Sequence, residues 1–184
     1  MGKENNLDEL RDSLIGILSQ GKSKKEIEKF LFLHENGEIG TFFDKSIVNI
    51  NMVLSEDGTK IINIYSNLIF DIAIEQKLLS YLLQLNSQSL TGAFNIITNE
   101  EGTRGIVSFS FAYMINEVDR DIFIKSFFTV GQIANYYAKE IKSKFGGLTI
   151  KEYIESEGKN IGEEAAKKPN KGKSERSEIK EIWE

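Results

Sequence analysis

The segment Asp71–Phe145 decides the fold and reads DIAIEQKLLSYLLQLNSQSLTGAFNIITNEEGTRGIVSFSFAYMINEVDRDIFIKSFFTVGQIANYYAKEIKSKF. Leucines recur in it at helical spacing up to Asn86, and Asp71 is available as N-cap, which predicts a helix over Asp71–Asn86. After Gly92 the apolar residues alternate with others, as they do in half-buried strands. A turn signal at 99–102 divides this alternation, so the pattern predicts an antiparallel hairpin. In its second strand the residues predicted to share one face are Val107, Phe109, Phe111 and Tyr113.

A second, longer helix is predicted from about Asp119 to Phe145, where Gly146-Gly147 can end it. Its apolar stripe follows steps of three and four residues and consists of Phe123, Phe127, Val130, Ala134, Tyr137, Ile141 and Phe145. Ile124, Phe128 and Tyr136 lie off that stripe, so the helix is apolar over more than half of its circumference. The surplus flank is either part of the core or an interface with a second subunit or a partner, and the sequence leaves both open.

The chain before this segment predicts one or two leading helices. Leucines and isoleucines at helical spacing run up to Gly21, which can end the first helix. Ser23 and Glu26 then form a capping box, which opens a second helix that we expect to continue through Leu33 until Asn36-Gly37 breaks it.

A first strand pair is predicted between these helices and the leucine-rich helix. Alternating apolar residues lie on both sides of Asp57-Gly58, which is a strong hairpin signal. The order strand–strand–helix therefore occurs twice, over Lys45–Asn86 and Gly92–Phe145. The predicted fold class is α+β: an antiparallel sheet built from two strand–strand–helix units, with helices packed on one face and one or two N-terminal helices before it.

The sequence divides into four predicted segments. Residues 1–21 form the N-terminal helix and residues 22–147 the α+β domain. Residues 148–157 form a short helical extension, which the capping box Thr149-Ile150-Lys151-Glu152 opens. Residues 158–184 are low in apolar content and rich in charge, which predicts a disordered tail. The tail ends in Ile179, Ile182 and Trp183, and these are either a short docking motif or an unstructured end.

Composition excludes several classes of site. The 184 residues contain no cysteine and one histidine, so no disulfide, thiolate nucleophile or multi-histidine metal site can form. A net charge of -5 argues against a general nucleic-acid binder, because phosphate binding needs a basic face. No apolar run is long enough for a membrane span and the N-terminus is polar, so the cytoplasm is the expected location. We predict no catalytic residues, no cofactor and no metal, and therefore no enzyme.

One motif offers an alternative function. Residues Gly16–Ser23, GILSQGKS, satisfy the P-loop pattern, in which Lys22 and Ser23 would bind a nucleotide phosphate and magnesium. A true P-loop follows a buried strand, whereas Leu7–Ile15 has helical spacing. Gly21 is then explained as a helix end and Ser23 as the next N-cap. A nucleotide-binding switch or NTPase is the alternative hypothesis.

The segment Leu78–Phe94, LLSYLLQLNSQSLTGAF, resembles the helix-to-strand passage of the YbjN family, which has the type III secretion chaperone-like fold. Gly92 with Phe94, the strand Ile106–Tyr113 and Phe145-Gly146-Gly147 extend the resemblance, which covers about residues 24–147. It implies a small α+β domain, often dimeric, that binds other proteins through apolar patches and sheet edges instead of turning over a substrate.

The leading hypothesis from the sequence is a protein-binding, chaperone-like or regulatory module, expected as a homodimer. Its candidate residues for the partner or dimer interface are Ile124, Phe128, Tyr136 and Trp183. A third hypothesis is a sensory or regulatory module whose tail docks a partner through Trp183. No nucleic acid and no membrane is expected as a partner.

Overall fold

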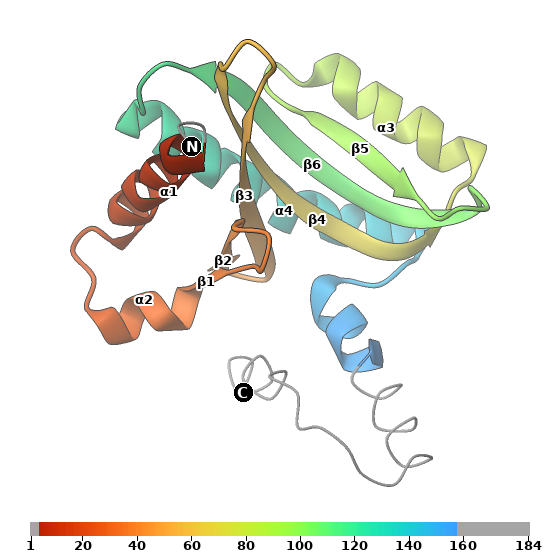
Figure 1. Ribbon diagram of the computed structural model, residues 1–184. Coiled ribbons are helices and arrows are strands. Elements are labelled where there is room, and N and C mark those ends of the chain that lie inside the picture. The colour runs from red at the N-terminus through yellow and green to blue at the C-terminus, as the bar shows by residue number, and fades with distance from the viewer. Residues whose placement is uncertain (1–3, 158–184) are drawn as a thin grey trace, which may run out of the picture. The chain divides into compact units, whose positions relative to one another are not determined.

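The computed structural model describes residues 4–157 of the chain (Figure 1). The chain forms two compact units, Met1–Ile150 and Lys151–Glu184, of which the second is described only over residues 151–157, which are helical. The elements of the first unit are α1 Glu4–Ser19, α2 Lys24–Phe30, β1 Leu31–Leu33, β2 Ile39–Phe43, β3 Ser46–Leu54, β4 Lys60–Ala73, α3 Gln76–Gln88, β5 Ala93–Thr98, β6 Arg104–Ile115 and α4 Arg120–Phe145.

A six-stranded antiparallel sheet in the order β1-β2-β3-β4-β6-β5 is the centre of the first unit. Consecutive strands β1 to β4 pair in turn, whereas α3 carries the chain from β4 past β6 to the edge strand β5 (Figure 1). The β5–β6 hairpin then places β6 between β5 and β4. The order β3-β4-α3 followed by β5-β6-α4 confirms the two predicted strand–strand–helix units and the α+β fold class.

One face of the sheet is apolar and carries the helices. Register places Ile50, Ile64 and Phe111 side by side on this face, and the α1 side chains Leu10, Leu14 and Leu18 belong to the same buried cluster. The stripe of α4 lies against it, with Phe123, Val130, Ala134 and Ile141 fully buried. The opposite face carries polar side chains at the intervening positions, among them Asn49, Asn63 and Ser110. This alternation is what a sheet covered by helices on one side requires.

The ends of α4 are as the sequence predicts. The Asp119 carboxylate accepts hydrogen bonds from the backbone amides of Asp121 and Ile122, and so caps the first turn. Gly146 ends the helix with a φ of 78°, in the left-handed range that favours glycine. The Ser23 capping box of α2 is also confirmed, with both of its reciprocal hydrogen bonds present.

The predicted helix over Asp71–Asn86 is wrong at its start. Strand β4 continues to Ala73, and α3 begins only at Gln76. The reason is burial: the apolar residues before and after Asp71 are enclosed by the sheet, and two register shifts let β4 bend there. Asp71 has a φ of 49° and is paired with the Arg104 guanidinium of β6, so it does not cap the helix.

The predicted helix through Leu33 is also too long. α2 ends at Phe30, and β1 pairs with β2 across a tight turn instead. In that turn the Asn36 side chain accepts from the Glu38 amide, while Gly37 has a φ of 81°. Asn-Gly is a strong hairpin signal, so the residues expected to break a helix form a hairpin turn. The sheet therefore has two strands beyond the four that the sequence predicts.

Candidate functional site

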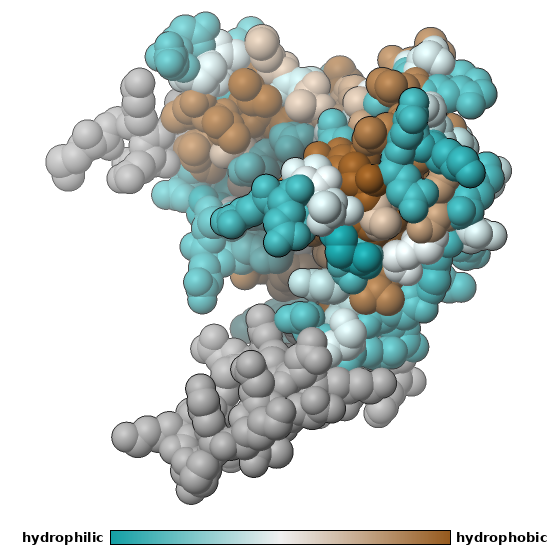
Figure 2. All heavy atoms as spheres, turned by 90° about the vertical axis from the view of Figure 1, so that its right-hand side faces the viewer, coloured by the Kyte–Doolittle hydropathy of each residue, from teal (hydrophilic) through white to brown (hydrophobic). Residues whose placement is uncertain are grey.

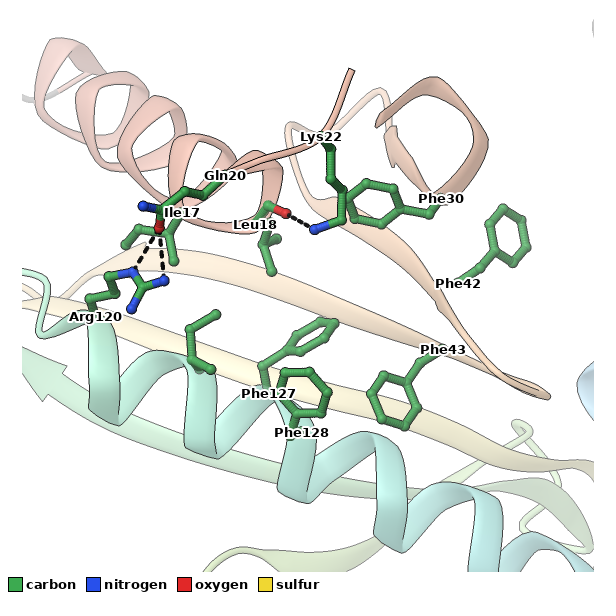
Figure 3. A pocket seen from close by; sticks show the side chains of 11 residues that line it. Ile17, Leu18, Gln20, Lys22, Phe30, Phe42, Phe43, Arg120, Phe127 and Phe128 are labelled. Carbon is green, nitrogen blue, oxygen red and sulfur yellow. Dashed lines mark hydrogen bonds between the residues drawn. The ribbon is translucent and has the colours of Figure 1, made fainter. Parts of the chain in front are cut away.

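A groove with a volume of about 420 Å³ lies between the end of α1, the helix α2, the strand β2 and the first half of α4 (Figure 3). Eight of its eleven lining residues are apolar and the other three are an amide and two cations. The lining residues are Ile17, Leu18, Gln20, Lys22, Phe30, Phe42, Phe43, Arg120, Ile124, Phe127 and Phe128. We call this surface the α1–α4 groove.

The floor of the α1–α4 groove is aromatic. The ring of Phe43 lies 5.8 Å from that of Phe127 and 5.5 Å from that of Phe128, in both cases edge to face. Phe127 is buried in the core, whereas the side chain of Phe128 is 48% exposed. The absence of a side chain at Gly131 makes room for Phe43, because a Cβ there would lie 2.5 Å from its ring. The floor is therefore an extension of the core that opens to solvent at Phe128.

The polar edge of the groove carries Lys22 and Arg120. The Lys22 ammonium donates to the Leu18 carbonyl oxygen at 2.8 Å and lies 4.9 Å from the centre of the Phe30 ring. The Arg120 guanidinium donates twice to the Gln20 side-chain oxygen, at 3.1 and 2.7 Å. These hydrogen-bond acceptors are neutral, and no lining residue is a carboxylate. The edge of the groove is thus positively charged in a chain whose net charge is -5.

The sequence-predicted interface residues fall into three groups. Ile124 and Phe128 both line the α1–α4 groove, one helical turn apart. Tyr136 is 66% exposed and packs on Tyr137, but it does not line the groove. It lies eight residues, or about 12 Å, further along α4 than Phe128. Trp183 lies outside the described residues. The structure therefore brings together two of the four.

The P-loop match has no P-loop structure around it. Gly16 lies inside α1, and the chain between α1 and α2 is a short turn in which Gly21 has a φ of 76°. Ser23 caps α2, and Lys22 binds the last turn of α1. The first described strand, β1, follows the motif instead of preceding it. The backbone amides that a nucleotide phosphate needs are therefore not arranged around a strand end.

Two tyrosines outside the groove have raised pKa values. Burial raises the pKa of Tyr113 to about 12 and that of Tyr81 to about 12. His34, the one histidine of the chain, lies in the β1–β2 turn, where its ring is 3.3 Å from the Asn49 side-chain oxygen. Over residues 4–157 no group of three or more histidine, cysteine or acidic side chains is placed to hold a metal ion. The described part of the chain also contains no helix with the length and apolar character to cross a membrane.

A second exposed apolar surface lies on the side of the first unit that carries α3 (Figure 2). Its members on α3 are Leu79 and Leu83, which are 42% and 69% exposed. Figure 2 shows apolar side chains in patches between polar ones over this region. We call these two residues the α3 patch.

Sequence reasoning missed most of the groove. Its α4 wall was found through the surplus apolar flank, since helical periodicity is local. The wall from Lys22, Phe30 and Phe42 was missed, because it depends on a short strand pair that the helical pattern hides. The contact between Gln20 and Arg120 joins residues 100 positions apart, and no local signal predicts it.

Comparisons with known proteins identify the fold. No family model and no curated protein sequence matches the chain. The structure is similar to the crystal structure of "YbjN, a putative transcription regulator from E. coli", with a TM-score of 0.50 over 73% of this chain and 92% of that one. The two sequences are 13% identical over this match. At that identity the likeness is one of fold, and the first unit of this chain has a YbjN-like fold.

Proposed function

We propose that this chain is a non-enzymatic protein-binding module with a regulatory or chaperone-like role, and that it holds an apolar segment of a partner in the α1–α4 groove. The observation that carries the proposal is the groove itself, an aromatic floor continuous with the core and open at Phe128. Exposed apolar surface on one side of a hollow is typical of a binding site.

The energetics favour association at this groove. Burying one large apolar side chain contributes about 1.5–3 kcal/mol, so two or three anchors from a partner offset much of the cost of association. Ile124 and Phe128 are already fixed on a 26-residue helix whose neighbouring apolar stripe is buried, and Ile124 itself packs partly against the core. A preformed surface loses little conformational entropy when it binds, which lowers the cost of association.

The comparison with YbjN is compatible with this proposal. That protein is described as "a putative transcription regulator", and regulation through protein contact needs a partner surface of the kind seen at the groove. The predicted homodimer and the docking of a tail through Trp183 stay predictions. Light scattering on the purified chain tests the first, and deletion of residues 158–184 tests the second.

The experiment that tests the proposal is site-specific crosslinking in the native host. A photoreactive phenylalanine analogue at position 128 should capture a partner, which mass spectrometry identifies, and the same analogue at Leu83 in the α3 patch serves as the matched control. The captured protein is then purified and its affinity measured by calorimetry. We expect the double variant Ile124→Asp and Phe128→Asp to lose binding, because each carboxylate would be desolvated against the aromatic floor.

The control variant is Leu79→Asp with Leu83→Asp, which places the same charge on the α3 patch. It should bind the partner with unchanged affinity. If the groove variant binds as tightly as the wild type, or if both variants lose binding equally, the groove is not the binding site and the proposal is wrong.

A further inference from the structure

We infer that the segment held in the α1–α4 groove is an amphipathic helix whose apolar face is flanked by carboxylates. This inference rests on the proposed function and specifies the chemistry of its partner. It follows from two properties of the groove: the backbone hydrogen bonds around it are largely paired already, and its edge carries positive charge.

The backbone around the groove favours a helix over an extended segment. Strand β2 pairs with β3 along Ile39–Phe43 and with β1 along Ile39–Thr41, so it offers no strand-length row of open backbone groups. An extended peptide on the apolar floor would leave its own amides and carbonyls without partners, which is costly. A helix satisfies its backbone internally and presents side chains at positions i, i+3 and i+4.

The charge along the edge favours an acidic flank on that helix. Lys22 and Arg120 are held by a backbone carbonyl and a side-chain amide, so their hydrogen bonds fix their positions without neutralising their charge. Two exposed carboxylates lie near these cations: Asp121 is 3.8 Å from Arg120, and Glu26, which is hydrogen-bonded to Ser23, interacts with the charge of Lys22. Such exposed contacts contribute little. A carboxylate of the partner would therefore approach two cations, Lys22 and Arg120, whose positions are already fixed by hydrogen bonds.

The positions of Lys22 and Arg120 in the groove predict where the carboxylates of the bound partner helix would lie. Figure 3 shows Arg120 at the end of the groove away from Phe42 and Phe43, with Lys22 on the side of α1 and α2. Apolar anchors would lie over the phenylalanines, and glutamate or aspartate would lie near the two cations. Electrostatic complementarity of this kind selects partners and speeds association more than it adds affinity.

The test uses two designed helical peptides that share one leucine face at i, i+4 and i+7. One carries glutamate and the other lysine at the flanking positions, and fluorescence anisotropy measures the binding of each to the full chain. We expect the glutamate peptide to bind about three- to tenfold tighter at 50 mM salt, as two exposed ion pairs allow. The preference should shrink at 500 mM salt, where charges are screened over about 4 Å.

Neutral variants assign the preference to the groove. Lys22→Gln with Arg120→Gln should bind both peptides alike, because glutamine keeps hydrogen-bonding capacity at both positions and removes the charge. Lys24→Gln with Lys25→Gln removes two exposed positive charges from α2 outside the lining and should keep the preference. Circular dichroism and urea unfolding check that each variant folds.

Each other outcome overturns the inference. Equal binding of the two peptides to the wild type, or a preference that survives in the Lys22 and Arg120 variant, refutes the acidic flank while the proposed function stands. Binding of neither peptide, together with a dimer that Phe128→Asp dissociates, assigns the groove to a second copy of the chain and refutes the inference. Binding of neither peptide without such a dimer refutes both the inference and the proposed groove.

Discussion

The two strand–strand–helix units share one order of elements but use their helices differently. α3 has 13 residues, of which Leu78 and Leu82 are buried, whereas α4 has 26 residues, of which seven are buried. α4 packs across the middle of the sheet against β3, β4 and β6, while α3 lies beside the edge strand β5 (Figure 1). The same local order therefore gives one central helix and one peripheral helix, because the sheet offers them different positions.

Both helices leave apolar side chains exposed, and the exposed flank of α4 borders the α1–α4 groove. Leu79 and Leu83 on α3 are 42% and 69% exposed, and Phe128 on α4 is 48% exposed. The flank of α4 faces a second wall from the end of α1 and from α2. Exposure alone does not distinguish a binding surface from ordinary surface leucines. The leading helices make the difference, because they turn an exposed flank into a groove.

The largest effect is expected from truncating the core side of α4. Phe123→Ala removes a fully buried ring and should destabilise the chain by about 3–5 kcal/mol. Phe128→Ala, five residues along the same helix, should cost about 1 kcal/mol, since its ring is half exposed. Urea unfolding followed by circular dichroism measures both. Equal losses would show that the flank is core and not a free surface.

A smaller effect is expected at the junction that holds α3. The Asn86 side chain accepts a hydrogen bond from the Phe94 amide at 2.7 Å and donates one to the Phe94 carbonyl at 3.0 Å. It therefore pairs both backbone polar groups of one residue in the edge strand β5. Asn86→Ala leaves both groups without a partner and should cost about 1–3 kcal/mol.

Hydrogen exchange makes the Asn86 prediction specific. The Phe94 amide should exchange faster in Asn86→Ala, while amides in β3 keep their protection relative to global stability. The matched control is Asn95→Ala, which removes an exposed amide that bonds Ala93 and Ser110 and should cost less than about 0.5 kcal/mol. Unchanged exchange at Phe94 would mean that another group caps the strand edge.

Helical and strand periods predicted most of the second half of the chain. The α4 stripe, its Asp119 cap and the alternation of β6 are local patterns, and each is decided by residues fewer than about five positions apart. The start of α3 was wrong for a different reason. Asp71 is a good N-cap, but the burial of its apolar neighbours in β4 and its pairing with Arg104 outweigh that preference.

The groove could be predicted only in part from the sequence. Ile124 and Phe128 stand out because they are apolar residues that lie outside the apolar stripe of the helix. Lys22 does not stand out as a groove residue, since in the sequence it belongs to the P-loop pattern and to the turn between two predicted helices. The wall around Phe42 needs the β1–β2 pairing, which depends on contacts across the Asn36-Gly37 turn and not on apolar period.

The smallest effect distinguishes the turn of the β3–β4 hairpin from that of the β5–β6 hairpin. In the β3–β4 turn the Asp57 carboxylate accepts from the Ser55 hydroxyl and the Thr59 amide, and these hydrogen bonds lower its pKa from 3.8 to about 2. In the β5–β6 turn the neutral Asn99 side chain takes the equivalent role and accepts from the Thr103 and Arg104 amides. Of these two turns, only the β3–β4 turn is therefore held by the side chain of a titratable residue, Asp57.

A lowered carboxyl pKa stabilises the folded state above the unfolded value of 3.8, and this contribution is lost as the pH falls through about 2. We expect acid to loosen the β3–β4 turn between about pH 4 and 2 while the β5–β6 turn is unaffected. Carbon NMR of the Asp57 carboxyl measures the pKa directly, and exchange of the Thr59 and Thr103 amides compares the turns. Asp57→Asn should make both turns insensitive to pH over this range. A measured pKa of Asp57 near 3.8 would mean that the two hairpins are closed by turns of equal sensitivity to acid.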